Sequence, residues 1–193
     1  IFVDTVTVDA GVMLTIEPGV TVDLDFWSLK IEDTLHAVGN ETQRIKIQTW
    51  ERPLVSNVRI YFTDSSAPWN EDTKTGCIIE YAEINIYGGG GCGIRGGSPK
   101  ISHNLMHFRG CDAGILTAGI ISNNTITISA YRAIVTEGNC QVLFNIIDGK
   151  DYMAVGIGVG GNLPTIIGNL ITNCYGWSTG AMSGYAGIVF YGG

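Results

Sequence analysis

The chain has 193 residues, which is enough for one domain with a substantial hydrophobic core. Apolar residues make up 45% and charged residues 15%, which excludes intrinsic disorder, and the 27 glycines are about twice the usual share, which indicates many turns. The net charge of −7 arises in residues 1–85, and no basic patch with interleaved aromatic residues occurs, so nucleic acid is not an expected partner. No apolar run reaches the roughly 18 residues of a membrane span.

Short segments with alternating apolar residues fill the N-terminal part, residues 1–62. In each segment the first and third side chains are expected to face a core and the middle one to face solvent, which is the period of a β-strand. Turn residues such as Glu17-Pro18-Gly19 separate the segments. The predicted strands are the triplets 6–8, 14–16, 20–22, 29–31, 35–37 and 45–47.

A loop and then a repeat follow. Residues 63–76 are rich in Ser, Asp, Pro, Asn and Thr, which predicts a loop that leaves the repeating structure. In residues 77–193 the frame Ile-x-x-Asn-x-(Ile/Met) recurs, with Ala82 in the Asn slot of a degenerate first copy. Successive slots, at positions 82, 104, 124, 145 and 169, are 20 to 24 residues apart, and an insertion at 174–186 lengthens the last copy.

A period near 21 that holds three short strands predicts a three-sided coil, in which each turn adds one strand to each of three parallel sheets. We therefore expect one all-β domain over residues 1–193, a right-handed parallel β-helix of about seven or eight coils. An amide can both donate and accept, so the in-phase asparagines are expected to stack as a hydrogen-bonded ladder at one bend. These asparagines are Asn104, Asn124, Asn145 and Asn169.

The residues also resemble a known family. The stretch Val6-Thr-Val-Asp-Ala-Gly-Val-Met-Leu-Thr-Ile-Glu-Pro-Gly-Val-Thr-Val22 resembles the opening of right-handed parallel β-helix domains in secreted or cell-surface bacterial and archaeal proteins. The later Ile-x-x-Asn-x-Ile frames are similar to the repeats that these domains share with pectate-lyase-like proteins. The resemblance covers essentially the whole chain and implies an extracellular or cell-surface location. It is specific for the fold and not for function, because this scaffold carries lyases, hydrolases, adhesins and inert stalks alike.

The sequence favours a non-catalytic module for adhesion, carbohydrate contact or assembly. Two alternatives stay open: a pectate-lyase-like lyase or hydrolase of polysaccharides, and a self-assembling extracellular filament or structural subunit. The expected partners are polysaccharides, other surface proteins, or further copies of the chain joined end to end through unpaired strands. No cofactor is expected, and calcium enters only under the lyase alternative.

The enzyme alternative depends on Asp148 and Asp151 near Lys150, with Arg109, Arg132 and His107 on neighbouring coils. Such a set could bind an acidic sugar and supply a base. His107 and Asp148 would lie two coils, or about 10 Å, apart, which is too far for a dyad, and a solvated, partly salt-bridged face explains the same residues. The candidates are Asp148, Asp151, Lys150, Arg109, Arg132 and His107.

Two further groups are candidates for binding. Aromatic faces are usual platforms for sugar rings and partner surfaces, although these aromatics would also serve to pack the insertion onto the coil. The aromatic group comprises Tyr175, Trp177, Tyr185 and Tyr191. An outward apolar strip of Leu116, Val135 and Val189 would be covered by a loop of the chain or by another subunit.

The five cysteines show no metal-ligand spacing. They are expected to act as small buried hydrophobic residues, with a Cys92–Cys111 disulfide as the alternative.

Overall fold

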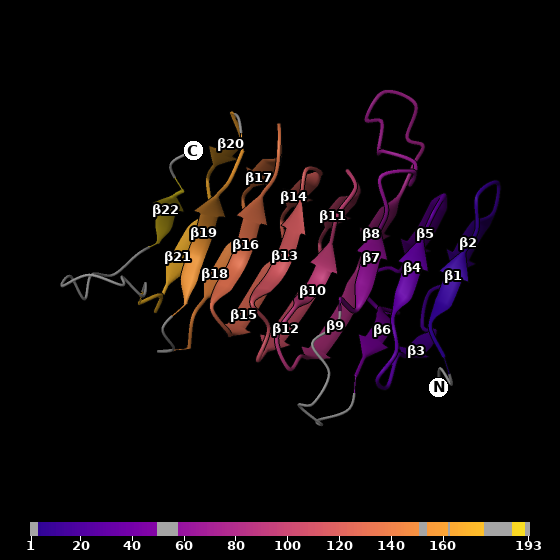
Figure 1. Cartoon of the computed structure of the whole chain (residues 1–193), viewed down its shortest axis with the longest axis horizontal. Coiled ribbons are helices and arrows are strands. Elements are labelled where there is room, and N and C mark those ends of the chain that lie inside the picture. Colours follow the sequence, from indigo (N-terminus) through magenta and orange to yellow (C-terminus); the bar gives the residue numbers. More distant parts are fainter. Residues whose placement is uncertain (1–3, 50–57, 151–153, 162, 176–186, 192–193) are drawn as a thin grey trace.

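The computed structural model describes residues 4–49, 58–150, 154–161, 163–175 and 187–191 (Figure 1). These residues form strands, turns and bends, and they contain no helix. Among them there is accordingly no helix of the length and apolarity that a membrane span requires.

The strands form three parallel sheets, which we call A, B and C. Sheet A consists of β1 (Val6–Val8), β4 (Leu29–Ile31), β7 (Ile60–Phe62), β10 (Cys92–Arg95), β13 (Ala113–Thr117), β16 (Arg132–Thr136), β19 (Val155–Val159) and β22 (Ile188–Phe190). Sheet B consists of β2 (Met13–Ile16), β5 (Thr34–Val38), β8 (Ile78–Glu80), β11 (Lys100–Ser102), β14 (Ile120–Ser122), β17 (Gln141–Leu143) and β20 (Thr165–Ile167). Sheet C consists of β3 (Thr21–Asp23), β6 (Ile45–Gln48), β9 (Ala82–Tyr87), β12 (Leu105–Arg109), β15 (Thr125–Ser129), β18 (Ile146–Asp148) and β21 (Leu170–Thr172).

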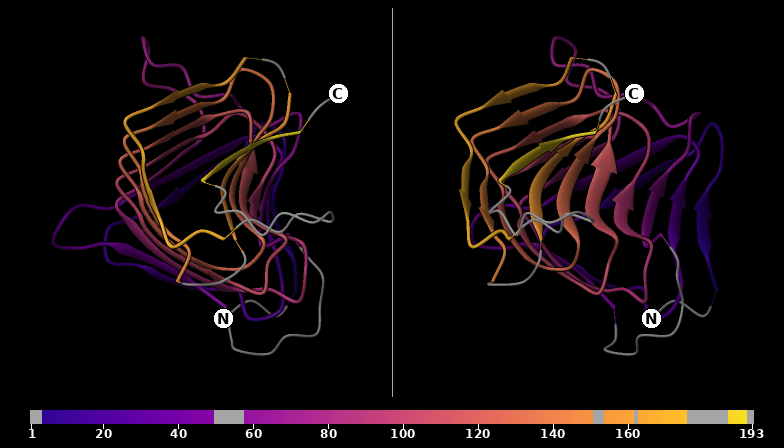
Figure 2. Two further views of the ribbon diagram at one scale, coloured as in Figure 1. Left: turned by 90° about the vertical axis from the view of Figure 1, so that its left-hand side faces the viewer. Right: turned by 60° about the vertical axis from the view of Figure 1, so that its left-hand side comes forward.

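The chain visits the sheets in the order A, B, C and then repeats, so every strand pairs with strands one coil before or after it. Seven turns stack in this way, and β22 begins a further one. Figure 2 shows the three sides of the coil and the sheets that run along it. The predicted fold class, an all-β parallel solenoid, is confirmed.

Side chains that face inward form continuous columns along the axis. The residue before the inward isoleucine of sheet A is small in coils 4 to 7. In coils 4 and 5 a Cβ on Gly93 or Gly114 would approach the buried Phe108 ring to 2.4 or 2.5 Å. Coil 3 instead has Arg59 there, which is 1% exposed and whose Nη1 donates to the carbonyl oxygen of Phe26 at 2.6 Å. One fully buried column of sheet A consists of Ile60, Ile94, Ile115, Ile134 and Ile157.

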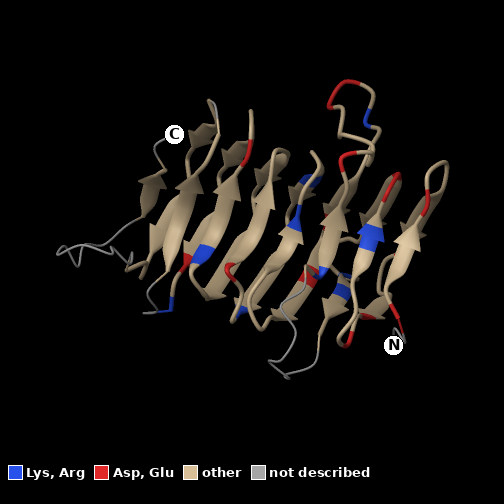
Figure 3. Cartoon of the chain, viewed as in Figure 1, with Lys and Arg blue, Asp and Glu red and all other residues tan. Residues whose placement is uncertain are grey.

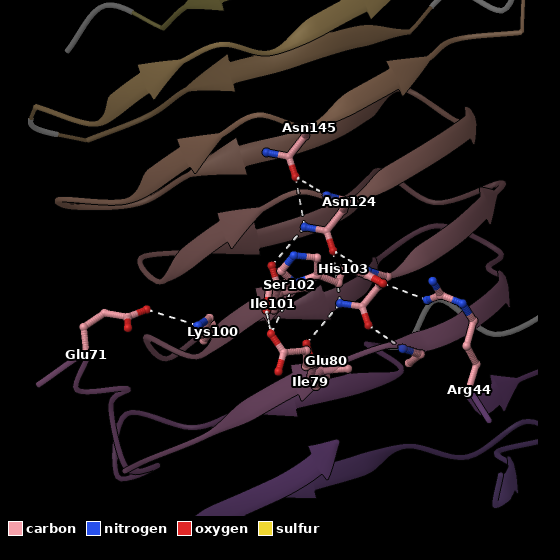
Figure 4. A network of polar contacts seen from close by, with 12 residues as sticks. Arg44, Glu71, Ile79, Glu80, Lys100, Ile101, Ser102, His103, Asn124 and Asn145 are labelled. Carbon is pink, nitrogen blue, oxygen red and sulfur yellow. Dashed lines mark hydrogen bonds and ion pairs between the residues drawn. The ribbon is translucent and has the colours of Figure 1, made fainter. Parts of the chain in front are cut away.

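The four slot asparagines stack at the bend between sheets B and C, as their common phase predicts. Figure 4 shows Asn124 and Asn145 of this ladder. The Nδ2 of each donates to the Oδ1 of the next, at 3.1 Å from Asn104 to Asn124 and at 2.9 Å in the two later steps. Each Nδ2 also donates to a sheet B carbonyl oxygen of the preceding coil, and each Oδ1 accepts the backbone N–H of the preceding slot. The ladder thus pairs bend groups that burial would otherwise leave unsatisfied.

The residue before each slot turns the chain with a positive φ. The values are 51°, 56°, 55°, 55° and 67° for Tyr81, His103, Asn123, Phe144 and Gly168. This left-handed conformation suits Gly and Asn but costs other residues about 1–2 kcal/mol. The bend therefore places three ring-bearing side chains, on coils 3, 4 and 6, in a conformation that their types disfavour.

Residues 63–77 connect β7 to β8, and part of this connection projects from the coil as the predicted loop 63–76 (Figure 1). An isolated antiparallel bridge joins Asn70 and Thr75 within this excursion. Its Glu71 forms ion pairs with Lys74 and, at 3.3 Å, with Lys100 of β11, and the hydrogen bond from Lys74 is the main reason that the pKa of Glu71 falls to about 2. The excursion is therefore tied by charge to sheet B.

Replacement of Asn124 or Asn145 by Ala should lower the free energy of unfolding by about 1–3 kcal/mol, because the change leaves buried bend groups unpaired. The measurement is urea denaturation of each variant. The exposed turn residue Asn139 provides the control, since Asn139→Ala should stay within about 0.5 kcal/mol of the wild type. Equal losses in ladder and control variants would show that the ladder is not stabilising.

Candidate functional site

In the middle of the coil, polar side chains gather on the outward face of sheet C. Along β9, β12 and β15 the odd-numbered residues point outward and alternate with buried core residues. Neighbouring strands are in register, so outward residues stand in columns, one of which runs Asn85, His107, Thr127 and Asp148. Parallel pairing therefore converts one residue per coil into a row of side chains about 4.8 Å apart.

A shallow hollow of about 170 Å³ lies on this face across coils 3, 4 and 5. Four of its seven lining residues carry an amide, imidazole or hydroxyl group, and these groups can both donate and accept hydrogen bonds. Glu83 supplies the only carboxylate of the lining, and its Oε1 accepts a hydrogen bond from Asn85 Nδ2 at 3.1 Å. The lining residues are Glu83, Asn85, Leu105, Met106, His107, Thr125 and Thr127.

The candidate residues of the enzyme alternative are divided between two sheets. His107 and Asp148 stand in one column with Thr127 between them, so they are two coils apart. Sheet C holds His107, Arg109 and Asp148, with Lys150 just after it; Arg132 begins β16 of sheet A, and Asp151 lies outside the described residues.

Neighbouring residues already bind the Asp148 carboxylate. Its Oδ1 accepts hydrogen bonds from Asn173 Nδ2 and from the backbone N–H of Lys150, both at 3.0 Å, and its Oδ2 lies 3.2 Å from Lys150 Nζ. The hydrogen bond from Asn173, followed by those from Lys150, lowers the pKa of Asp148. The Asp148 carboxylate is thus ionised at neutral pH and caps the turn at Lys150. It is a poor proton acceptor.

His107 stands between two neutral side chains in its column. Its partners in register are Asn85 on β9 and Thr127 on β15. Burial is the main cause that lowers the pKa of His107, and the charges of Arg109 and Lys150 add to it. The imidazole is therefore neutral at pH 7 and presents one donor and one acceptor to the hollow.

Charge is distributed unevenly along the coil (Figure 3). Acidic residues predominate in residues 1–85, whereas residues 152–193 contain no charged residue. Among the described residues no three His, Cys, Asp or Glu side chains converge as metal ligands.

The aromatic candidates lie toward the last coils. Tyr175 is half-buried, Tyr191 is 42% exposed, and the guanidinium carbon of Arg132 lies 5.9 Å from the Tyr191 ring centroid. Trp177 and Tyr185 lie outside the described residues. A common platform of all four rings therefore stays a prediction.

The apolar strip is partly covered by the chain itself. Val135 retains 7% of its exposure and belongs to a small cluster with Cys92 and Ala113, against which Val58 and Leu116 pack. Val189 is half-buried on β22. Leu116 and Val189 thus remain more accessible to a partner than Val135 does.

Sequence reasoning did not identify the rings at the bend between sheets B and C. The Tyr81 and His103 rings stack with centroids 5.0 Å apart and planes 16° apart, and the guanidinium carbon of Arg44 lies 5.7 Å from the Tyr81 centroid. The available signal was positional, because each of these aromatic residues directly precedes an Asn-slot position.

Comparison with known protein families, with curated proteins and with solved structures found no match to this chain. The parallel solenoid is shown by the structure itself.

The five cysteines are buried free thiols, so the alternative of a Cys92–Cys111 disulfide does not hold in the structure. Burial raises the pKa of Cys111 and of Cys140 to about 12 and that of Cys174 to about 11. Cys111 packs in the interior, whereas Cys92 belongs to the cluster on the outer side of sheet A.

The native protein should react slowly with Ellman's reagent at pH 8, because the thiols are buried and protonated. In denaturant without reductant, all five thiols should titrate. A count of three in denaturant would reveal one disulfide.

The same buried thiols predict a pH dependence of stability. Since folding raises the pKa values of Cys111 and Cys140, their contribution to the free energy of unfolding should be fully present below pH 9, the ordinary pKa of these thiols. The free energy of unfolding should then decline as the pH rises above 9.

Proposed function

We propose that the chain is a non-catalytic carbohydrate-binding module of an extracellular or cell-surface protein, and that its binding surface is the outward face of sheet C. The hollow on that face carries the proposal. Its amide, imidazole and hydroxyl groups repeat at the coil spacing and match the alternating donors and acceptors of a sugar chain.

The arrangement of the carboxylates favours binding over hydrolysis. Glycoside hydrolysis by the common mechanisms needs two carboxyl groups on either side of the scissile bond, and the hollow contains only Glu83. Asp148 lies two coils from His107 and already accepts three hydrogen bonds or ion pairs.

A pectate-lyase-like activity is the second candidate. It is favoured by the cationic side chains near the hollow, since Arg109 lies on the same strand as His107 and Lys150 follows β18. An anionic sugar would be drawn to these charges, with calcium as the metal that such an activity implies.

Self-assembly is the third candidate. Within the described residues β1, β2 and β3 each pair with one strand only, and an apolar hollow of about 330 Å³ lies at that end of the coil between Val6, Leu14, Val22 and Leu29. A second copy that added its strands there would continue the sheets.

Isothermal titration with neutral hexasaccharides of the α-1,4-, β-1,3- and β-1,4-glucan types tests the binding proposal. The double variant His107→Ala, Thr127→Ala should weaken the binding by at least about fivefold, because it removes two hydrogen-bonding groups from the hollow. Gln141→Ala, an exposed change on sheet B, should leave the affinity unchanged.

An equal effect of the Gln141 change, or no binding of any hexasaccharide, would contradict the proposal. Release of unsaturated products from polygalacturonate with calcium would instead establish the lyase alternative.

A further inference from the structure

We infer that the bend between sheets B and C carries a ring-stacking subsite centred on Asn123, between the rings of His103 and Phe144. The inference rests on the proposed function and extends it. The ligand of the subsite is a neutral pyranose ring, the neighbour of the sugar that occupies the hollow on sheet C.

The first part of the subsite is a fixed stack of rings. Arg44, Tyr81 and His103 come from coils 2, 3 and 4 and contact one another in sequence along the bend. Arg44 Nη1 donates to the His103 carbonyl oxygen at 2.7 Å, and His103 Nδ1 lies 3.3 Å from Glu80 Oε1 (Figure 4). Tyr81 and Glu80 thus contact the His103 ring, while 39% of the side chain stays exposed.

The stack stops at the next coil. There the same bend position holds Asn123, which is exposed, and the following coil holds Phe144, which is 57% exposed. The Phe144 ring lies over Gly168, where a Cβ would come within 2.3 Å of it, so this ring leans toward coil 7 and away from Asn123.

The bend position between the two rings carries a small polar side chain. His103 and Phe144 are two coils apart, about 10 Å along the axis, and Asn123 stands on the coil between them. The exposed Asn123 amide can donate to and accept from the hydroxyls of a sugar ring that lies at this position.

The subsite adjoins the hollow. Asn123 is two residues from Thr125, and His103 is two residues from Leu105, and both of these residues line the hollow. Two residues of a strand span about 7 Å, so one oligosaccharide can contact the bend and the hollow together.

The backbone supports a binding role for these rings. Gly or Asn would satisfy the positive φ at lower cost, and Asn123 and Gly168 do so in their coils. His103 and Phe144 occupy the same conformation with bulky, exposed side chains. Residues held in such conformations concentrate at ligand-binding positions.

Phe144→Ala tests the inference. With a neutral hexasaccharide that binds the wild type, the variant should bind about threefold to tenfold more weakly, since an aromatic contact is lost. Upfield NMR shifts of the sugar ring protons, which stacking on an aromatic face produces, should disappear in the variant. Tyr131→Ala is the matched control, because Tyr131 is 51% exposed at a bend between sheets C and A.

The outcomes separate this inference from the proposed function. If the double variant of His107 and Thr127 loses affinity while Phe144→Ala binds as the wild type does, the subsite is wrong and the module stands. If the wild type binds none of the hexasaccharides, both are wrong. If Phe144→Ala changes only the concentration dependence of self-association, the ring serves contacts between copies and the inference is overturned.

Discussion

The hydrogen-bonded column of asparagine amides is the interaction on which the arrangement of coils 3 to 7 depends. Each amide joins the coil before it to the coil after it, through its own Nδ2 and Oδ1 and through the backbone N–H of its neighbour. A slip of one residue in any coil would turn its core side chains outward and break two of these bonds. The ladder therefore holds the three sheets in one register.

This register determines what the surface can do. Because inward and outward residues alternate, a fixed core column implies fixed outward columns, and side chains some 20 residues apart in sequence stand side by side. Sheet C presents the hollow around His107, and the bend beside it presents Tyr81, His103 and Phe144. The ladder lies directly beneath these rings, since Tyr81, His103 and Phe144 each directly precede a slot position. In our account the asparagine ladder and the binding surface lie on the two sides of one bend.

Periodic features of the fold were predictable from the sequence, and local exceptions were not. The repeat predicted the sheets and the ladder. Strand β3 begins at Thr21, one residue later than the predicted triplet, and β7 went unpredicted because Arg59 stands where other coils have a small residue.

The sequence predicted where the candidate site residues stand, but not which groups their side chains contact. Phase placed His107 and Asp148 in one column, but it could not show that Asn173 and Lys150 occupy the Asp148 carboxylate. The partial cover over Val135 involves Val58, which is remote in sequence. The bend rings were missed because Tyr, His, Asn, Phe and Gly share no side-chain chemistry, only a backbone conformation.

The most direct test of this account is a backbone-resolved NMR titration of the protein with the neutral hexasaccharide that binds it. The account predicts that the shifted amides form one contiguous patch over β9, β12, β15 and the adjoining bend at His103, Asn123 and Phe144. Shifts confined to the last coils around Tyr191, or to the apolar end around Val6, would contradict it.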